Sequence, residues 1–434
     1  MPLSSEQVAQ RWIEAHAART SDASTLATLL RASRARTLAL AEAYEAALGA
    51  NLPVPCSPQL NPPLWELGHI GWFQEYWLAR NPQHQLGITA NPDAPRTASC
   101  LPHADAHYNS SQVAHASRWH LPLPDLHATK VFLKTSLAST MALLTDESAS
   151  DAALYFYRLA LFHEDMHGEA AVYMAQALGI ALPPSLIDDR VPAATEPMQA
   201  LRLEAGNWTL GYANTMQATQ PGSTAPGFAF DNELAPHTVE LSAYEIDDRP
   251  VSWQRYLSFV AAGGYTDPRY WSVAGWQWLT AQTPSPTQTV LWPRYLRQGH
   301  RATGEPVWEH CLFGRWQTLN LDTPACHLSY FEAEAWCRWA GRQLPTEAQW
   351  EQAAMTLPGF CWGEVWEWTA STFTPYPGFK AHPYRDYSAP WFGSRPVLRG
   401  ASLATSARMV HPRYRNYFTP ERNDIHAGFR TCTG

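Results

Sequence analysis

The stretch LFHEDMHGE, residues 161–169, is the part of the chain from which the rest can be interpreted. It lies inside residues 152–178, a segment of strong helix formers without proline. Residues four apart share one face of a helix, so His163 and His167 have the spacing of two imidazoles that chelate one metal ion. Glu169 follows two positions later, and we expect it to hold a ligand histidine as a hydrogen-bond acceptor.

Two other interpretations of this stretch stay open. Two histidines four apart can arise by chance in a chain of 434 residues. The same letters also match H-E-x-x-H, the zinc protease motif, in which Glu164 would be the general base. The motif therefore indicates a metal without determining the chemistry.

The composition predicts a globular protein with large cores. Apolar residues make up 45% of the chain and charged residues 16%, and 434 residues suffice for two or three domains. The 20 tryptophans each need a partner for the indole N–H when buried. The formal charge of −8 and the lack of any basic run exclude nucleic acid as the main ligand.

The chain shows no sign of export or membrane insertion. Residues 1–19 lack the apolar core of a secretory signal, and no segment approaches the roughly 18 apolar residues that span a bilayer. The seven cysteines are scattered, and none forms C-x-x-C. These features predict a cytoplasmic protein with reduced thiols and no membrane partner.

The first half has the pattern of a helical bundle. Helical periodicity occupies residues 5–48, 64–79, 125–145 and 152–178. Residues 81–107 are polar and contain prolines, which predicts a loop. Metal sites in bundles form between facing helices. His69, on the second helix, is by itself most simply a core histidine, but beside His163 and His167 it would complete an open three-nitrogen site.

The second half has shorter segments. Residues 183–197 have the composition of a linker, and residues 265–318 have little periodicity, which predicts irregular structure. We expect a strand pair at 201–211, a strand at 239–246 and short helices at 252–262 and 330–340.

Four strings in this half belong together: GRQLPTEAQWE (341–351), GEVWEWT (363–369), VLRGAS (397–402) and GFR (428–430). Their order resembles the formylglycine-generating-enzyme-like domain, which has an irregular, C-type-lectin-like fold. The resemblance implies an α+β chain of two domains, a helical bundle at 1–190 that carries the iron ligands and the second domain at 198–434.

The first half resembles the DinB-like four-helix bundle of ergothioneine sulfoxide synthases. The resemblance rests on PPLWELGH (62–69) and on the H-x-x-x-H-x-E pattern that begins at His163. It implies that His69, His163 and His167 bind Fe(II). That family uses iron and O2 to join a sulfur donor to the imidazole C2 of hercynine, the trimethylated form of histidine. The related selenoneine synthases use a selenosugar and form a C–Se bond.

The resemblance also implies substrate residues. Asn416 matches the asparagine that contacts the hercynine carboxylate, and Tyr417 lies beside it. Tyr384 and Tyr387 follow Pro-Gly-Phe at 377–379, as in the family, which makes Tyr384 the candidate proton donor. Both tyrosines could instead be packing or hydrogen-bonding residues of an aromatic domain.

Two departures from the family concern contacts with the substrates. Met166 stands where mycobacterial-type enzymes have a glutamine that contacts hercynine, and Phe418 stands where they have an aspartate for the amine of γ-glutamylcysteine. An apolar ring cannot replace that carboxylate. Arg422 keeps the position of a contact to the donor carboxylate. With the string LNPPLWELGHIGWFQE (60–75), these residues resemble the selenoneine synthase branch most. We therefore expect hercynine, O2 and a selenosugar as substrates, with a thiol donor as the alternative.

Three other functions compete with this interpretation. A zinc protease needs a third ligand, and no histidine or glutamate follows the motif on the bundle at an obvious spacing. A formylglycine-generating enzyme needs paired cysteines after the VLRGAS string, and residues 399–416 contain none. A binding module without catalysis would be favoured if His69 did not meet His163 and His167 in space.

Overall fold

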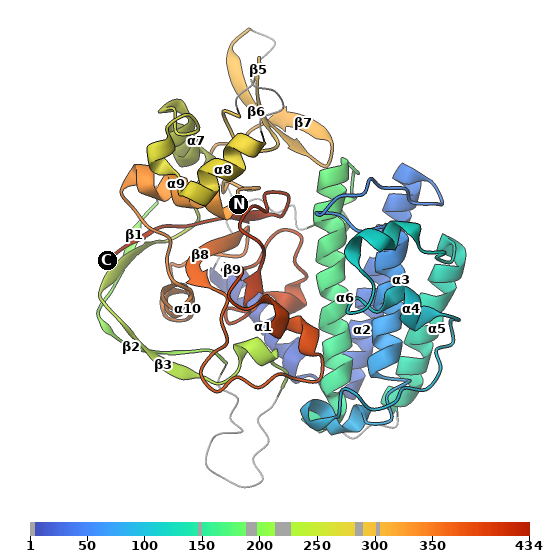
Figure 1. The fold of residues 1–434 in the computed structure, drawn as a ribbon. Helices are drawn as coiled ribbons and strands as arrows, with labels where there is room; N and C mark the ends of the chain where they lie inside the picture. The colour runs from blue at the N-terminus through green and yellow to red at the C-terminus, as the bar shows by residue number, and fades with distance from the viewer. Residues whose placement is uncertain (1–4, 146–149, 188–197, 213–226, 283–289, 301–303) are drawn as a thin grey trace.

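The computed structural model describes residues 5–145, 150–187, 198–212, 227–282, 290–300 and 304–434. Two parts stand side by side: a bundle of long helices, on the right in Figure 1, and a mixed region of short strands and helices on the left. The predicted α+β class, with a helical N-terminal part and a mixed C-terminal part, is confirmed.

The bundle consists of four long helices, which are α2 (Ala23–Leu48), α3 (Pro63–Trp77), α5 (Leu126–Thr145) and α6 (Asp151–Leu178). Helix α3 packs against α5 and α6, and α2 packs against α6 and α5. The predicted helices at 64–79, 125–145 and 152–178 match α3, α5 and α6 to within two residues at each end. This arrangement brings α3 and α6, which carry the candidate metal ligands, into contact.

The ends of α6 follow from local chemistry. The side chain of Ser150 accepts a hydrogen bond from the backbone N–H of Ala153, which caps the start of the helix. The helix ends at Gly179, whose φ of +70° lies in the left-handed region that favours glycine. Between these caps the segment has no helix breaker, so both histidines lie well inside the helix.

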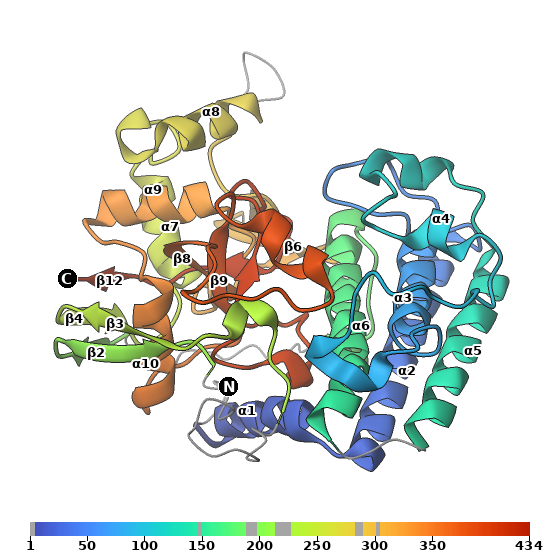
Figure 2. The ribbon, with the colours of Figure 1, turned by 60° about the horizontal axis from the view of Figure 1, so that its bottom comes forward.

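The single helical stretch predicted at 5–48 is wrong in one respect, because it forms two helices, α1 (Ser5–Thr20) and α2. The break occurs because the side chain of Asp22 accepts a hydrogen bond from the N–H of Thr25 and starts a new helix. Helix α1 leaves the bundle and lies across both parts (Figure 2). Its Arg19 forms a buried ion pair with Glu233 of the mixed region at 2.8 Å.

The predicted loop at 81–107 also contains two short elements, η1 (His84–Thr89) and α4 (Ala104–Tyr108). The predicted linker at 183–197 lies outside the described residues beyond residue 187, and its first part contains η3 (Pro184–Leu186). Of these elements α4 matters most for the site, because it ends at Tyr108 against α3.

The mixed region is built around a small sheet. Strand β8 (Trp366–Thr372) pairs antiparallel with β9 (Pro396–Gly400) and parallel with β11 (Ala427–Gly428), and β9 also pairs with β10 (Asn416–Tyr417). The other strands are β1 (Ala200–Leu203), β2 (Gly206–Leu210), β3 (His237–Leu241), β4 (Tyr244–Asp247), β5 (Leu296–His300), β6 (Pro306–Leu312), β7 (Arg315–Thr318) and β12 (Cys432–Thr433). The helices are α7 (Trp253–Ala261), α8 (Val273–Ala281), α9 (Tyr330–Ala340) and α10 (Glu347–Thr356).

Three predictions for this region need correction. The strands at 201–211 exist, but they do not pair with each other, because β1 joins β4 and β12 while β2 joins β3. The predicted strand at 239–246 is divided into β3 and β4, which belong to different sheets. Residues 265–318, predicted to be irregular, contain α8 and the sheet β5-β6-β7, which projects at the top of Figure 1. The errors in the strands concern long-range pairing, which local periodicity does not encode, whereas α8 is a local helix that was missed.

The core of the mixed region is rich in tryptophan. Trp350, Trp366 and Trp368 are almost fully buried, and each indole N–H has a partner. Trp350 donates to Glu367 at 2.9 Å and Trp368 to the carbonyl of Leu328 at 2.8 Å. The abundance of tryptophan thus reflects a packed core with satisfied N–H groups, as the composition predicts.

Charged groups also join the two parts along α6. The Asp165 carboxylate accepts hydrogen bonds from Arg408 at 2.6 and 2.9 Å and from Ser33 of α2 at 2.8 Å. Glu169 accepts from the indole N–H of Trp366 and from the hydroxyl of Ser402. Because Asp165 is 2% exposed, these contacts are buried and hold the mixed region against one face of α6.

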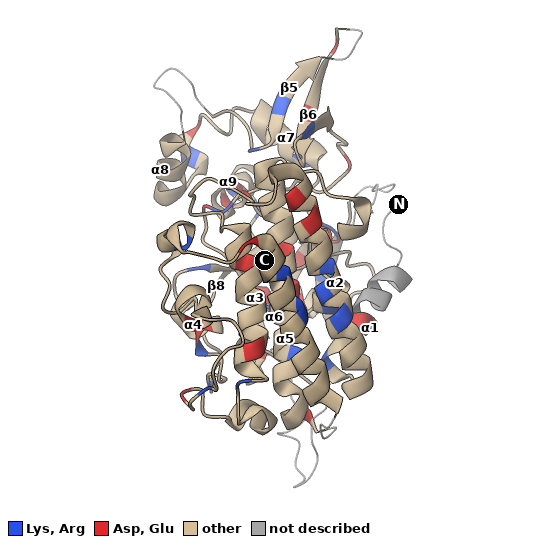
Figure 3. Cartoon of the chain, turned by 90° about the vertical axis from the view of Figure 1, so that its right-hand side faces the viewer, with Lys and Arg blue, Asp and Glu red and all other residues tan. Residues whose placement is uncertain are grey.

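Within the described residues, no helix is long and apolar enough to cross a membrane. Figure 3 shows basic and acidic residues interspersed along the helices of the bundle face. The view thus agrees with the sequence, in which no basic run stands out.

Candidate metal centre

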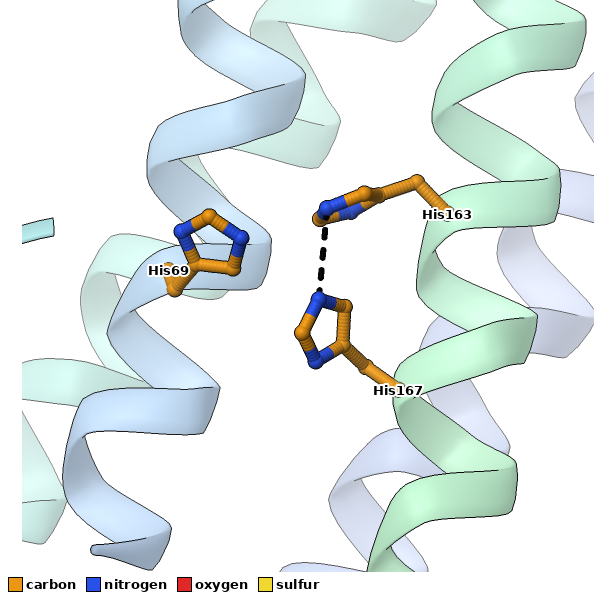
Figure 4. Close-up of side chains that lie close together, drawn as sticks. All are labelled: His69, His163 and His167. Atoms are coloured by element: carbon orange, nitrogen blue, oxygen red, sulfur yellow. Dashed lines mark hydrogen bonds between the residues drawn. The ribbon is translucent and has the colours of Figure 1, made fainter. Parts of the chain in front are cut away.

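Three imidazoles that are distant in sequence meet between α3 and α6. His69 extends from α3 toward His163 and His167 on α6 (Figure 4), and one ligand nitrogen from each lies within 4.8 Å of the others. The Nε2 atoms of His163 and His167 are 3.2 Å apart. His69 and His163 are each 3% exposed. The alternative of a binding module without catalysis would be favoured only if His69 lay apart from the other two histidines. Because the three rings converge, this alternative loses its support.

Hydrogen bonds to the outer ring nitrogens orient two of the imidazoles. The Nδ1 of His69 is 2.7 Å from the backbone carbonyl of Tyr108, at the end of α4. A carbonyl only accepts, so Nδ1 carries the hydrogen and Nε2 keeps its lone pair. The Nδ1 of His167 likewise meets the carboxylate of Glu66 on α3. Both rings therefore present an unprotonated Nε2 toward the centre.

Glu66 is itself held in place. Asn61 donates to its other carboxylate oxygen at 2.6 Å, and Arg118 donates to the side-chain oxygen of Asn61 at 2.9 Å. Burial would raise the pKa of the Glu66 carboxyl, but the charge of His167 and its hydrogen bond outweigh burial, so this pKa lies below its ordinary value. Glu66 is therefore an ionised acceptor for the His167 N–H.

The role expected for Glu169 is corrected by this geometry. Glu169 was predicted to hold a ligand histidine, but its hydrogen bonds are to Trp366 and Ser402, on the side of α6 that faces the mixed region. Glu66, three residues before His69, takes that role. The sequence did contain a signal for Glu66, because residues three apart share a helix face and Glu66 therefore lies on the same face of α3 as His69.

Aromatic rings surround the imidazoles. The His163 ring stacks on Phe73 with centroids 3.5 Å apart and planes within 4°. The His69 ring stacks on Trp65 at 4.8 Å. Tyr384, from the mixed region, packs edge-on against Phe73 at 4.9 Å. These rings limit the access of water and fix the ring planes.

Burial also keeps the imidazoles neutral. It lowers the pKa of His69 to about 3, with a smaller contribution from the neighbouring His167. Burial and the same neighbour lower the pKa of His163 well below its ordinary value. Neutral imidazole is the form that binds metal, so near neutral pH both rings are ready to act as ligands.

The chemistry of this cluster fits a divalent transition metal. Three imidazole nitrogens suit Fe(II) or Zn(II), and three protein ligands leave coordination positions for substrates. The carboxylate and carbonyl behind two of the rings provide the outer hydrogen bonds that metal-bound histidines usually make. The donor set alone does not choose between iron and zinc.

Glu164 lacks the environment of a protease base. Both of its oxygens pair with Arg34, at 2.7 and 3.0 Å, and Thr37 donates a further hydrogen bond at 2.8 Å. The ion pair is buried, with both side chains 2% exposed. A carboxylate whose two oxygens are bound to α2 is not free to activate a water molecule. The surroundings of Glu164 therefore argue against a zinc protease.

The candidate substrate residues lie on the mixed-region side of the histidines. The Tyr384 ring centroid is 6.2 Å from those of His163 and Tyr387. Burial raises the pKa of Tyr384 above its ordinary value, so its phenol is protonated near neutral pH. Tyr387 donates to the hydroxyl of Tyr414 at 3.2 Å, and Tyr414 donates to the sulfur of Met166 at 3.4 Å. Met166 thus contacts the tyrosine cluster.

The segment at 416–424 lies further from the imidazoles. Asn416 and Tyr417 form β10, and the Tyr417 hydroxyl donates to the backbone carbonyl of Tyr387. Arg422 pairs with Asp424 at 2.6 and 2.7 Å and lies 4.9 Å from the centroid of the Phe418 ring. The contact predicted between Asn416 and a substrate carboxylate stays a prediction.

Comparisons with known proteins cover most of the chain. The profile of the Sulfatase-modifying factor enzyme 1-like domain matches residues 191–360 and 361–433. Hercynine oxygenase of Mycolicibacterium smegmatis is 30% identical, over 94% of this chain and 98% of that protein. Hercynine oxygenase of Mycobacterium tuberculosis is 29% identical, over 93% and 97%. A formylglycine-generating enzyme of Streptomyces coelicolor is 27% identical, over 53% of this chain and 87% of its own.

The two glutamates beside the histidines provide a test of the site. We expect Glu66→Gln to weaken Fe(II) binding about 10- to 100-fold, because the amide is a weaker acceptor for the His167 N–H than the carboxylate is. Glu169→Gln is the matched control, and it should change the dissociation constant less than threefold. Anaerobic titration with an iron chelator measures both. A larger loss in the Glu169 variant would contradict this assignment.

Proposed function

The chain belongs to the hercynine oxygenase family, and from this premise we propose that it catalyses the iron- and O2-dependent joining of a chalcogen donor to the imidazole C2 of hercynine. The donor in this proposal is a selenosugar, so the new bond is C–Se, formed in place of the C2–H bond with O2 as the electron acceptor. Cleavage of the bond between selenium and the sugar then gives selenoneine. A thiol donor, which would form a C–S bond as in ergothioneine synthesis, is the second candidate.

One observation carries the proposal: three imidazoles face a common point at the junction of the two parts. His69, His163 and His167 would hold Fe(II), with Glu66 and the Tyr108 carbonyl fixing two of the rings. Bound iron would supply O2 activation and the oxidising equivalents for bond formation. The protein groups hold the substrates beside the metal and limit the access of water.

Tyr384 is the proposed proton donor. Its ring lies beside Phe73 and His163, on the side from which the mixed region closes the site. Its buried phenol keeps its proton near neutral pH and can therefore donate a hydrogen bond or a proton to a reacting atom. Tyr387 and Tyr417 support the segment that carries it, through the hydrogen bond between the Tyr417 hydroxyl and the Tyr387 carbonyl.

The surroundings of Arg422 support a donor without an amino-acid end. The Nε and Nη2 of Arg422 are both bound to Asp424, so its charge is already matched within the chain. Phe418 and Tyr173 lie against the guanidinium, with centroids 4.9 and 5.3 Å away. Neither ring can bind an ammonium group as a carboxylate does. These contacts favour a sugar over γ-glutamylcysteine as the donor.

Asn416 and Tyr417 are proposed to bind hercynine at its carboxylate. The support for this role is the resemblance of the local segment and its place on β10, next to the tyrosine cluster. Met166, with its sulfur against Tyr414, would line the same side of the pocket.

The donor is tested by mass spectrometry of the products from iron-loaded enzyme supplied with hercynine, O2 and either a selenosugar or γ-glutamylcysteine. We expect a selenium-containing product with the former and little turnover with the latter. Phe418→Asp should raise turnover of γ-glutamylcysteine at least about tenfold, because it restores a carboxylate for the ammonium group. Phe418→Leu is the control and should not. Wild-type product from the thiol alone would contradict the choice of selenium.

The role of Tyr384 is tested by removing its hydroxyl. Tyr384→Phe should lower the rate of product formation by about 10²- to 10⁴-fold, the usual contribution of a general acid, while iron affinity stays unchanged. Tyr155→Phe is the matched control, because that buried hydroxyl contacts His382 rather than the three histidines. Equal rates for the Tyr384 variant and wild type in single-turnover kinetics would assign Tyr384 to packing.

A further inference from the structure

A second cavity lies in the mixed region. Its volume is about 320 Å³, at the lower end of the range for small-molecule sites. Strands β5, β6 and β7 form one wall, and the segments before β8 and β11 form the opposite wall. None of the three candidate metal ligands lines it. A ligand here would therefore bind separately from the metal centre.

The strongest feature of this cavity is His426. The side chain lines the cavity, its residue is 2% exposed, and neither ring nitrogen has a hydrogen-bond partner among the described residues. Tyr295 and His327 also line the cavity, and the polar atoms of their side chains are buried. The His327 ring centroid is 4.7 Å from that of His426 and 4.8 Å from that of Tyr295.

Buried polar atoms without partners are costly, and native proteins retain few of them. His426 has two such atoms, the two nitrogens of its ring. The backbone there is strained as well, because Tyr295 and His327 have φ values of +64° and +60°, in the left-handed region that side chains other than glycine rarely adopt. Strain and unpaired polar groups that occur together are typical of functional sites.

The polar groups in the cavity indicate what could satisfy them. Burial lowers the pKa of His426 to about 4, so its imidazole is neutral near pH 7 and offers one N–H donor and one nitrogen acceptor. A metal ion is excluded as the partner, because His69, His163 and His167 are the only described cluster of three ligand atoms near enough for one ion. The ligand must itself provide donors and acceptors side by side, as hydroxyl groups do.

The charge and the apolar walls of the cavity further narrow the class of ligand that would fit it. Arg294 and Glu364 both line the cavity, so it carries one charge of each sign and does not favour an ion. Trp253, Val365 and Leu403 add apolar wall. A sugar ring combines hydroxyl groups around its edge with apolar C–H faces. We propose that this cavity is a binding site for a small neutral polyol of the monosaccharide class, held by His426, His327 and Tyr295.

The strand β6, which lines the cavity, also contacts the helix that carries the metal ligands. The side chain of Gln176 on α6 donates to the backbone carbonyl of Cys311 at 2.9 Å and accepts from the N–H of Phe313 at 2.6 Å. Cys311 lines the cavity. Gln176 is nine residues beyond His167, about 14 Å along the helix axis. A ligand in the cavity would therefore bind next to α6 without contacting the metal site.

The test is to titrate metal-free protein with glucose, glucose 1-phosphate and benzoate, and to detect binding by saturation-transfer NMR. Glucose should bind saturably with a dissociation constant in the millimolar range, and benzoate should not bind. His426→Phe should weaken glucose binding at least tenfold. The matched control is His382→Phe, because His382 is also buried but has a partner in Tyr155, and this variant should bind glucose normally.

Thermal unfolding of the two variants adds a second measurement. His426→Phe removes no hydrogen bond of the free protein and should leave the melting temperature unchanged or higher, whereas His382→Phe should lower it. The proposal is overturned if glucose does not saturate at tens of millimolar, or if His426→Phe binds it like wild type. It is also overturned if only glucose 1-phosphate binds. Because no iron or hercynine is present, failure here is distinct from failure of the proposed reaction.

Discussion

The arrangement of partners around α6 is the constraint on which the rest of the structure depends. His163 and His167 point toward α3, Glu164 pairs with Arg34 of α2, and Asp165 and Glu169 point toward the mixed region. His163, Glu164 and Asp165 are buried and His167 and Glu169 are half-buried, so these polar groups need partners of matching chemistry. A rotation of the helix would leave buried charges unpaired on three sides at once. The orientation of the histidines is thus set by the carboxylates beside them.

A second consequence concerns the junction of the two parts. The contacts of Asp165 with Arg408 and of Glu169 with Trp366 place the mixed region directly beside the histidine-bearing turn of α6. Tyr384 and Tyr414 then reach the site from segments that lie far beyond α6 in the sequence. Neither part alone provides both the three histidines and Tyr384. The site is therefore a property of the joined molecule.

Much of the fold and of the candidate site could be predicted from the sequence, but with a clear limit. Helical periodicity located α3, α5 and α6, and the spacing of His163 and His167 placed them on one face. His69 joined them only through a family resemblance, since its own surroundings suit an ordinary core residue. The hydrogen-bond partner of His167 was misassigned to Glu169, because proximity in sequence was taken for proximity in space. The polar cavity around His426 was not predicted, because its lining residues are scattered from 253 to 426.

The most direct measurement of the central claim is an X-ray absorption spectrum of the iron-loaded protein, prepared without oxygen, beside the spectra of His69→Ala and His163→Ala variants. The account predicts scattering from three imidazoles in the wild-type spectrum and from two in each variant that still binds iron. Iron bound at full stoichiometry with no imidazole scattering would contradict it. A spectrum of the His69 variant identical to that of wild type would contradict it equally.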